Sequence, residues 1–170
     1  MLYERHLAEN PECIVTLNRL GGLYLKICLL LEAEECFKKA LFLDNRNSEA
    51  RFMLASTLKE KGDFKVARKL FVDIAADCEY YNASIIELVK LNIFFKYYKD
   101  AQETIENKEI STSYFNFLRS IALRKDGLVD SSREILEKIS EIDEYILAEK
   151  FMLGEEKEFI NYVPNYFRVF

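Results

Sequence analysis

The chain has 170 residues, and half of them are apolar, which is enough for one domain with a continuous core. Its formal net charge of −5 argues against a basic surface of the kind that attracts nucleic acid or anionic lipid. Only five Gly and two Pro are present, and apolar residues recur at helical spacing. The sequence therefore predicts an all-α protein.

The first half of the chain is predicted to form a lone helix and two helix pairs. The lone helix covers residues 2–9 and is ended by Asn10-Pro11. The first pair covers residues 12–25 and 31–43. In the second pair Ser48 is a suitable N-cap, the turn is Lys61-Gly62-Asp63, and the second helix covers residues 64–76.

The second half continues with two more predicted pairs and a different ending. The third pair lies in residues 82–112, and the fourth lies in residues 113–140 with its turn at Lys125-Asp126-Gly127. Residues 141–170 are expected to form capping helices and an aromatic tail. Because aromatic side chains bury a large apolar area when they dock, the tail is expected to pack back onto the last helices.

A period of thirty-four residues connects these pairs. The stretch LGGLYLKICLLLEAEECFKKALFLDN, residues 20–45, carries Leu-Gly, then Tyr24, and later Ala33 and Phe37. The same residue types return at multiples of thirty-four. The recurring sets are Leu20, Leu54 and Leu88; Ala33, Ala67 and Ala101; and Tyr3, Phe37, Phe71 and Ile105.

These spacings resemble the helix-turn-helix signature of the tetratricopeptide repeat (TPR) family. The resemblance implies an all-α, right-handed α-solenoid of stacked antiparallel helix pairs, with about ten helices in a single domain over residues 1–170. Residues 1–11 would be the second helix of a partial repeat, the repeats would cover 12–47, 48–81, 82–112 and 113–140, and 141–170 would hold the capping helices and tail.

In such a solenoid the first helix of each pair, helix A, lines a concave groove, and the period projects a set of residues onto it. These residues mix large apolar groups with three cations and one anion, which suits an extended or helical peptide with apolar anchors and some acidic character. Alternatively, Phe52, Ile86 and Phe117 pack on one another across a tightly curved solenoid. The projected groove residues are Val15, Asn18, Gly22, Leu25, Glu49, Phe52, Ser56, Lys59, Ala83, Ile86, Lys90, Ile93, Tyr114, Phe117, Ile121 and Arg124.

One ligand class within the family can be excluded by inspection. Carboxylate-clamp modules bind the acidic C-terminal tails of heat-shock chaperones with Lys and Asn on the first A helix, Asn on the second, and Lys and Arg on the third. The corresponding positions here hold Asn18 and Gly22, then Met53, then Ala83 and Glu87. Since no cation is in place to pair with a terminal carboxylate, this ligand is not expected.

The sequence therefore predicts a protein–protein interaction scaffold or adaptor that binds a peptide or protein partner in its concave groove. One alternative is a structural assembly subunit, or a fragment of a larger TPR protein, that self-associates through its ends. The residues at the first end are Leu2, Tyr3 and Leu7. A small secretion-type chaperone is a further alternative.

Catalysis and cofactor binding are not expected. His6 is the only histidine and lies in the first helix, so a nucleophile–base pair built on histidine would have to form at that end of the chain. No phosphate loop, zinc-protease or hydrolase motif occurs. Cys13, Cys28, Cys36 and Cys78 form no C-x-x-C pair, so reduced, packed thiols and no metal are expected.

The start of the chain has charges where a signal peptide would need an apolar core, and the longest apolar run, around residues 27–31, is too short to span a membrane. No membrane insertion is expected. A cytoplasmic location is expected if the chain is not an excised piece of a larger protein.

Overall fold

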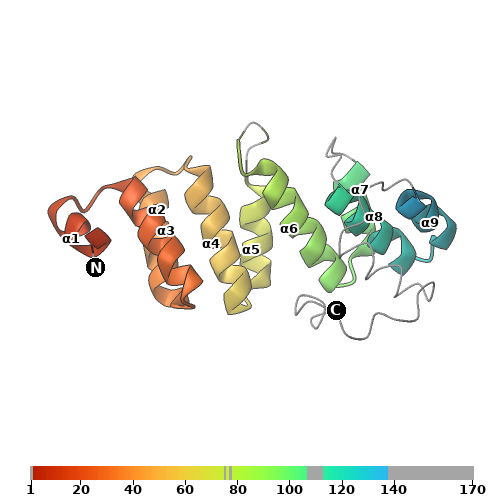
Figure 1. The fold of residues 1–170 in the computed structure, drawn as a ribbon, viewed down its shortest axis with the longest axis horizontal. Coiled ribbons are helices and arrows are strands. Elements are labelled where there is room, and N and C mark those ends of the chain that lie inside the picture. Colours follow the sequence, from red (N-terminus) through yellow and green to blue (C-terminus); the bar gives the residue numbers. More distant parts are fainter. Residues whose placement is uncertain (1, 75, 77, 107–112, 138–170) are drawn as a thin grey trace. The chain divides into compact units, whose positions relative to one another are not determined.

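The computed structural model describes residues 2–74, 76, 78–106 and 113–137. This part of the chain contains nine α-helices and no strand (Figure 1). The prediction of an all-α helical-repeat protein is therefore confirmed. The chain divides into two compact units, residues 1–88 and 89–170, and each unit is described by itself.

Unit 1 contains α1 (Leu2–Glu9), α2 (Ile14–Lys26), α3 (Leu30–Leu43), α4 (Ser48–Lys61), α5 (Phe64–Val72) and the first half of α6 (Tyr81–Phe94). Figure 1 shows α2 to α5 side by side in chain order. Each of these helices packs against its neighbour in the sequence, and α2 also reaches α4. This is the packing expected of stacked helix pairs.

Unit 2 contains the rest of α6, then α7 (Tyr98–Glu106), α8 (Ser113–Lys125) and α9 (Val129–Glu137). Here α7 packs on α8, and α8 packs on α9. The capping helices and aromatic tail predicted for residues 141–170 lie outside the described residues.

The core includes the residues that recur with the period. Ala33 and Phe37 of α3 are completely buried, and their counterparts Ala67 and Phe71 of α5 are buried to the same degree. Ala101 of α7 is also completely buried. Small residues at the Ala positions allow helices to approach closely, and the aromatic rings fill the space between them.

Close approach also explains one of the two glycines in the middle of α2. A Cβ placed on Gly21 would lie 2.8 Å from two ring atoms of Phe37 and 3.1 Å from Cβ of Cys36. A Cβ placed on Gly22 would meet only Cε of Met53, at 3.8 Å. Packing against α3 therefore requires Gly21 but does not require Gly22.

The same left-handed turn joins the two helices of every pair in the described residues. In unit 1, Cys28 has φ 60° and Gly62 has φ 89°; in unit 2, Lys96 has φ 63° and Gly127 has φ 89°. At Gly62, the Gly62 amide donates to the Lys59 carbonyl at 3.0 Å and the Asp63 amide donates to the Leu58 carbonyl at 2.8 Å. Equivalent bonds occur at the other three turns, and this pairing satisfies carbonyls at the end of the first helix.

Along the sequence, the turn of the fourth pair follows the turn of the third pair three residues earlier than the period predicts. Cys28, Gly62 and Lys96 follow one another at thirty-four residues, whereas Gly127 follows Lys96 at thirty-one. In this pair serines replace the small apolar residues: Ser120 and Ser132 are completely buried, and Ser132 Oγ donates to the Ser120 carbonyl at 2.9 Å. A buried hydroxyl with a hydrogen-bond partner can occupy a place that alanine occupies elsewhere.

Two sequence-based boundaries were wrong. The N-cap of α4 is Asn47 rather than Ser48, because the Asn47 side chain accepts a hydrogen bond from the Ala50 amide at 2.8 Å. The helix predicted over residues 64–76 ends at Val72.

Candidate partner-binding face

In unit 1 the projected groove residues lie on α2 and α4, and we call the side of these two helices that carries them the A-face. The solvent exposure of its side chains varies strongly. Val15 is 64% exposed and Glu49 is exposed, whereas Leu25, Phe52, Ser56 and Lys59 are half-buried and Asn18 is only 4% exposed. Ala83 and Ile86, on the part of α6 that belongs to unit 1, are half-buried.

Asn18 connects α2 to α4 and does not point freely into solvent. Its Nδ2 donates to Oε2 of Glu49 at 2.8 Å and to Oδ1 of Asn47 at 3.2 Å. Its own Oδ1 is buried with no hydrogen-bond partner. The expectation that Asn18 is exposed for ligand contact is therefore wrong, because the neighbouring helix covers it.

Phe52 belongs to an aromatic cluster. Its ring centroid lies 5.6 Å from that of Phe71 in an edge-to-face arrangement and 5.4 Å from that of Tyr80. Burial, together with the carboxylates of Glu49 and Glu79, raises the pKa of Tyr80 above its usual value. Phe52 thus packs on residues of its own unit, as the packing alternative expected, although its neighbours are Phe71 and Tyr80.

Lys59 is paired within the chain. Its Nζ lies 2.8 Å from Oε2 of Glu87 on α6 and 3.6 Å from Oε1 of Glu60. Ser56 Oγ donates to the Phe52 carbonyl one turn earlier, at 3.0 Å. Several residues projected onto the groove therefore join one helix to the next or bond within their own helix.

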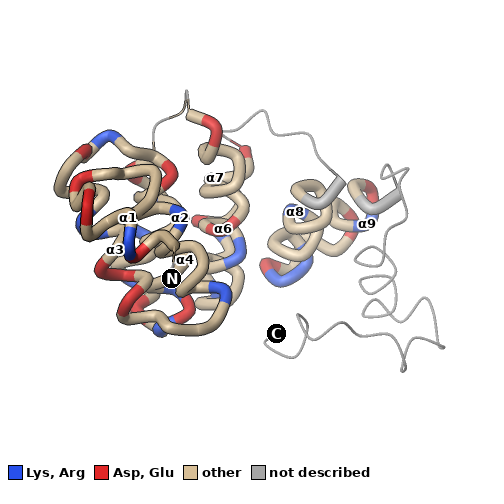
Figure 2. Tube along the Cα trace, turned by 60° about the vertical axis from the view of Figure 1, so that its left-hand side comes forward, with Lys and Arg blue, Asp and Glu red and all other residues tan. Residues whose placement is uncertain are grey.

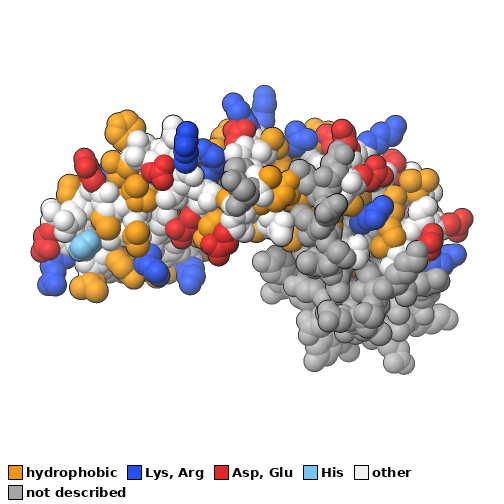
Figure 3. All heavy atoms as spheres, turned by 90° about the horizontal axis from the view of Figure 1, so that it is seen from above, with side chains coloured by type: hydrophobic (Ala, Val, Ile, Leu, Met, Phe, Trp, Pro, Cys, Tyr) orange, Lys and Arg blue, Asp and Glu red, His pale blue; other side chains and the backbone are white. Residues whose placement is uncertain are grey.

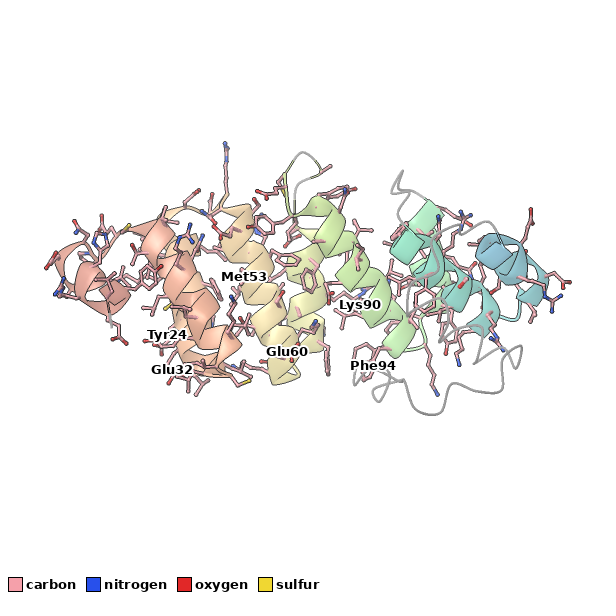
Figure 4. All side chains as sticks on the ribbon, viewed as in Figure 1. Tyr24, Glu32, Met53, Glu60, Lys90 and Phe94 are labelled. Atoms are coloured by element: carbon pink, nitrogen blue, oxygen red, sulfur yellow. The ribbon has the colours of Figure 1, made fainter. Side chains whose placement is uncertain are left out.

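Gly22 lies in the middle of the A-face, beside Met53. A methyl group on Gly22 would make only an ordinary van der Waals contact with Met53 Cε, so there is room at this position for a small group. Met53 is half-buried, and its position on α4, together with Glu60 further along the same helix, is shown in Figure 4. A residue without a side chain, flanked by an adaptable thioether, lets a ligand approach the backbone closely.

The projected residues of unit 2 differ in exposure. Lys90 is half-buried, whereas Ile93 is 6% exposed and Phe117 only 2%. Ile121 and Arg124 are half-buried, and the side chain of Tyr114 lies outside the described residues. The expectation that Ile93 and Phe117 are exposed to a ligand is wrong, because both side chains are buried.

The residues proposed for self-association lie on α1. No residue of α1 is buried, and Leu2 is 71% exposed, but Tyr3 is half-buried. Leu7 packs against a cluster of Leu17, Ala40 and Ala50. Leu2 is therefore the most exposed of the three, and Leu7 already has neighbours within the chain.

Charge does not single out a face of unit 1. Figure 2 shows acidic and basic residues interspersed along α1 to α4, and Figure 3 shows apolar side chains scattered among them on the visible face. Among the described residues, no group of three or more His, Cys, Asp and Glu is placed to hold a metal ion. None of the helices searched is long and apolar enough to cross a bilayer.

Sequence reasoning missed the partners of the projected residues. Tyr80 and Asn47 were not considered, and Glu87 and Met53 were considered only as clamp positions. A periodic alignment assigns each residue to a helix face, but it does not say which side chain of the next helix covers that face. The one usable signal was the pair of mid-helix glycines, because two glycines in a helix need an explanation.

Comparison with known proteins supports the fold. No family model matches the sequence, and no curated protein matches it. Two crystal structures of MamA are similar to this chain. The first is 20% identical, has a TM-score of 0.71, and matches 91% of this chain and 88% of that chain. The second is 21% identical, has a TM-score of 0.70, and matches 95% of this chain and 85% of that chain. YrrB, described as a TPR protein with an unusual peptide-binding site, is similar at 16% identity, with a TM-score of 0.70 and coverage of 94% and 88%.

Proposed function

We propose that this chain, which is a tetratricopeptide-like helical-repeat protein, is a non-enzymatic scaffold or adaptor that binds a peptide or protein partner on its A-face. The observation that carries the proposal is the contrast between the two adjacent glycines of α2. Gly21 is explained by the Phe37 ring, whereas nothing in the packing explains Gly22. A glycine in the middle of a helix costs about 1 kcal/mol relative to alanine, and close approach of a ligand would account for Gly22.

The surroundings of Gly22 suit a peptide with an apolar group. Met53 beside it can adjust its side chain to the shape of a ligand, and Val15 is an exposed apolar group on the same helix as Gly22. Glu49 is exposed at the start of α4 and can accept hydrogen bonds from a ligand backbone or pair with a cation. The peptide-binding site described for YrrB belongs to that protein, and it makes the same class of ligand reasonable here.

The test begins with photo-crosslinking in source cells from a reactive amino acid at position 53, compared with one at Lys39 on the exposed side of α3. Proteins captured only from position 53 are then purified and titrated with the wild-type chain, Gly22→Leu and Lys39→Leu. We expect Gly22→Leu to weaken binding at least tenfold, and Lys39→Leu to bind as the wild type does. Equal affinities for all three chains would contradict the proposal, provided that thermal unfolding shows all three to be folded.

A second candidate function is favoured by the exposure of α1. Because Leu2 is 71% exposed and no residue of α1 is buried, this helix could stack on a second copy of the chain. The measurement is sedimentation velocity over a range of concentrations with the wild type and Leu2→Glu. A concentration-dependent dimer that is lost in Leu2→Glu would favour assembly, and a monomer at all concentrations would exclude it.

A further inference from the structure

Exposed apolar side chains gather at the turn between α2 and α3. Ile27 is 56% exposed and Leu31 is 66% exposed, and the Cys28 thiol at the centre of the turn is exposed as well. Leu23 and Leu29 are also exposed large apolar residues. We call these five residues, Leu23, Ile27, Cys28, Leu29 and Leu31, the apolar tip.

Backbone hydrogen bonds hold the apolar tip in one shape. The Leu29 amide donates to the Tyr24 carbonyl at 2.9 Å, which joins the turn to α2. The Ala33 amide donates to the Leu29 carbonyl at 3.1 Å, which joins the turn to α3. Figure 4 shows Tyr24 and Glu32 toward this end of the helix pair. Because the backbone of the tip is already ordered, a partner that binds there loses little free energy in ordering it.

The fold does not require apolar residues at this turn. The equivalent turn of the second pair lies thirty-four residues later and has the same left-handed geometry. The residues that replace Ile27, Leu29 and Leu31 there are all charged, namely Lys61, Asp63 and Lys65. Exposed apolar surface is unfavourable in water, and a cluster of it marks a contact site. The apolar character of the first turn is therefore explained by a partner and not by the fold.

Charges of opposite sign lie on the two sides of the apolar tip. Lys26 ends α2 just before the turn, and Glu32 lies in the first turn of α3 just after it; both are exposed. Among the described residues, no ion pair includes Lys26 or Glu32. A two-fold axis at Cys28, perpendicular to the chain, places Lys26 of one copy opposite Glu32 of a second copy, and this happens twice. The apolar tip is therefore complementary in charge to itself.

We propose that the apolar tip binds the same tip of a second copy of the chain across a two-fold axis. Apolar side chains of the two copies pack at the centre of this contact, and two pairs of Lys26 with Glu32 lie at its rim. The contact involves neither the A-face nor Leu2, so it is independent of both functions proposed above. Five residues are fewer than the about 20–30 per partner of a standard interface, so the dimer is weak and reversible.

A lipid surface is the other kind of partner for an exposed apolar tip, and the charges disfavour it. Glu32 and Glu35 are both exposed at the start of α3, next to the tip. Together with the net charge of −5, they repel the anionic headgroups that attract proteins to membranes. A second copy, in contrast, offers a cation to each Glu32.

The test uses the reduced 170-residue chain and a short bis-maleimide, which joins two thiols only when they lie close together. We expect a covalent dimer in which mass spectrometry finds Cys28 joined to Cys28, and no such dimer in Cys28→Ser. Ile27→Glu should lower the yield at least tenfold, after correction for the rate at which a simple maleimide labels Cys28. Val66→Glu is the matched control, because Val66 of α5 is nearly as exposed as Ile27 and lies outside the tip. It should leave the yield unchanged, as should Leu2→Glu.

A charge exchange separates the two-fold contact from chance collisions of exposed thiols. Lys26→Glu and Glu32→Lys should each lower the corrected yield at least threefold, because each places like charges opposite one another. The double variant should restore the yield to the wild-type level. General repulsion between molecules predicts something different, because the two single variants change the net charge in opposite directions and would move the yield in opposite directions.

Two results would overturn the proposal. The first is a corrected yield that is the same in the wild type, Ile27→Glu and both single charge variants, or that stays low in the double variant, with circular dichroism showing every chain to be folded. The second is binding of the wild-type chain to phosphatidylcholine vesicles that Ile27→Glu abolishes, which would assign the apolar tip to a lipid surface instead.

Discussion

Gly21 of α2 faces the ring of Phe37 of α3 so closely that a Cβ at position 21 would lie 2.8 Å from two ring atoms. Phe37 is completely buried, so its ring cannot move aside into solvent. Gly21→Ala should therefore destabilise the protein by about 1–3 kcal/mol, as overpacking in a core does. The shift in the midpoint of urea unfolding measures this effect, and an unchanged midpoint would show that α2 and α3 can separate without loss.

Gly22→Ala is the matched control and should stabilise the protein instead of destabilising it. The added methyl group meets only Met53, at an ordinary contact distance, and alanine is favoured over glycine in a helix by about 0.5–1 kcal/mol. The same urea titration should show a higher midpoint. Destabilisation would mean that Gly22 has a structural role that the contacts do not reveal.

Replacing the non-glycine residues in the left-handed turns should stabilise the protein. Cys28 and Lys96 have φ values of 60° and 63°, which L-residues adopt at a cost of about 1 kcal/mol or more. Cys28→Gly and Lys96→Gly should each raise the free energy of unfolding by about 0.5–1 kcal/mol. Gly62→Ala, at the equivalent turn, should lower it by about 1 kcal/mol, and equal effects of all three changes would contradict the turn geometry.

The N-cap of α4 gives a second comparison between adjacent residues, Asn47 and Ser48. Asn47 Oδ1 accepts hydrogen bonds from the Ala50 amide and from Asn18 Nδ2, so Asn47→Ala removes both. We expect a loss of about 1–2 kcal/mol in the free energy of unfolding, measured by thermal denaturation. Ser48→Ala should change stability by less than about 0.5 kcal/mol. A larger effect at Ser48 than at Asn47 would restore the sequence-based assignment of the cap.

Glu34 should make stability depend on pH in the acid range. Its carboxylate pairs with Lys38 at 2.5 Å and with Lys61, and these two cations hold the pKa of Glu34 below its usual value of 4.5. The stabilisation is present above about pH 4.5 and is lost as pH falls through the lowered pKa. Because the pairs lie near the surface, the effect should be at most about 1 kcal/mol.

The comparison is between the wild type and Glu34→Gln in denaturant titrations from pH 3 to pH 7. The difference in stability should be constant above pH 5 and should shrink at lower pH. A difference that grows as pH falls would contradict the sign argued for Glu34.

Much of the fold could be predicted from the sequence because the same spacing of residue types occurs in several repeats. A single Leu-Gly or Ala-x-x-x-Phe spacing means little, but its return after thirty-four residues fixes which residues form the core. Ala33, Ala67 and Ala101 are all completely buried, as the period predicts. The turn at Gly127 was also predicted, from its local Lys-Asp-Gly sequence, because the period alone would place that turn three residues later.

The candidate site was predicted less well, for a physical reason. Several of the projected residues lie against a neighbouring helix or segment, so their exposure depends on the side chains of that neighbour. Asn18 is covered because Glu49 and Asn47 accept its hydrogen bonds, and Phe52 is covered because Tyr80 lies against it. Those pairings depend on side-chain length and direction, which a period of thirty-four residues does not encode.

Within unit 1, most contacts between helices join neighbours in the chain, with a smaller set between α2 and α4. Loss of order at one end therefore leaves the contacts of the other end intact, and unfolding can proceed helix by helix. Since α1 has no buried residue, it should fray first and exchange its amide hydrogens fastest.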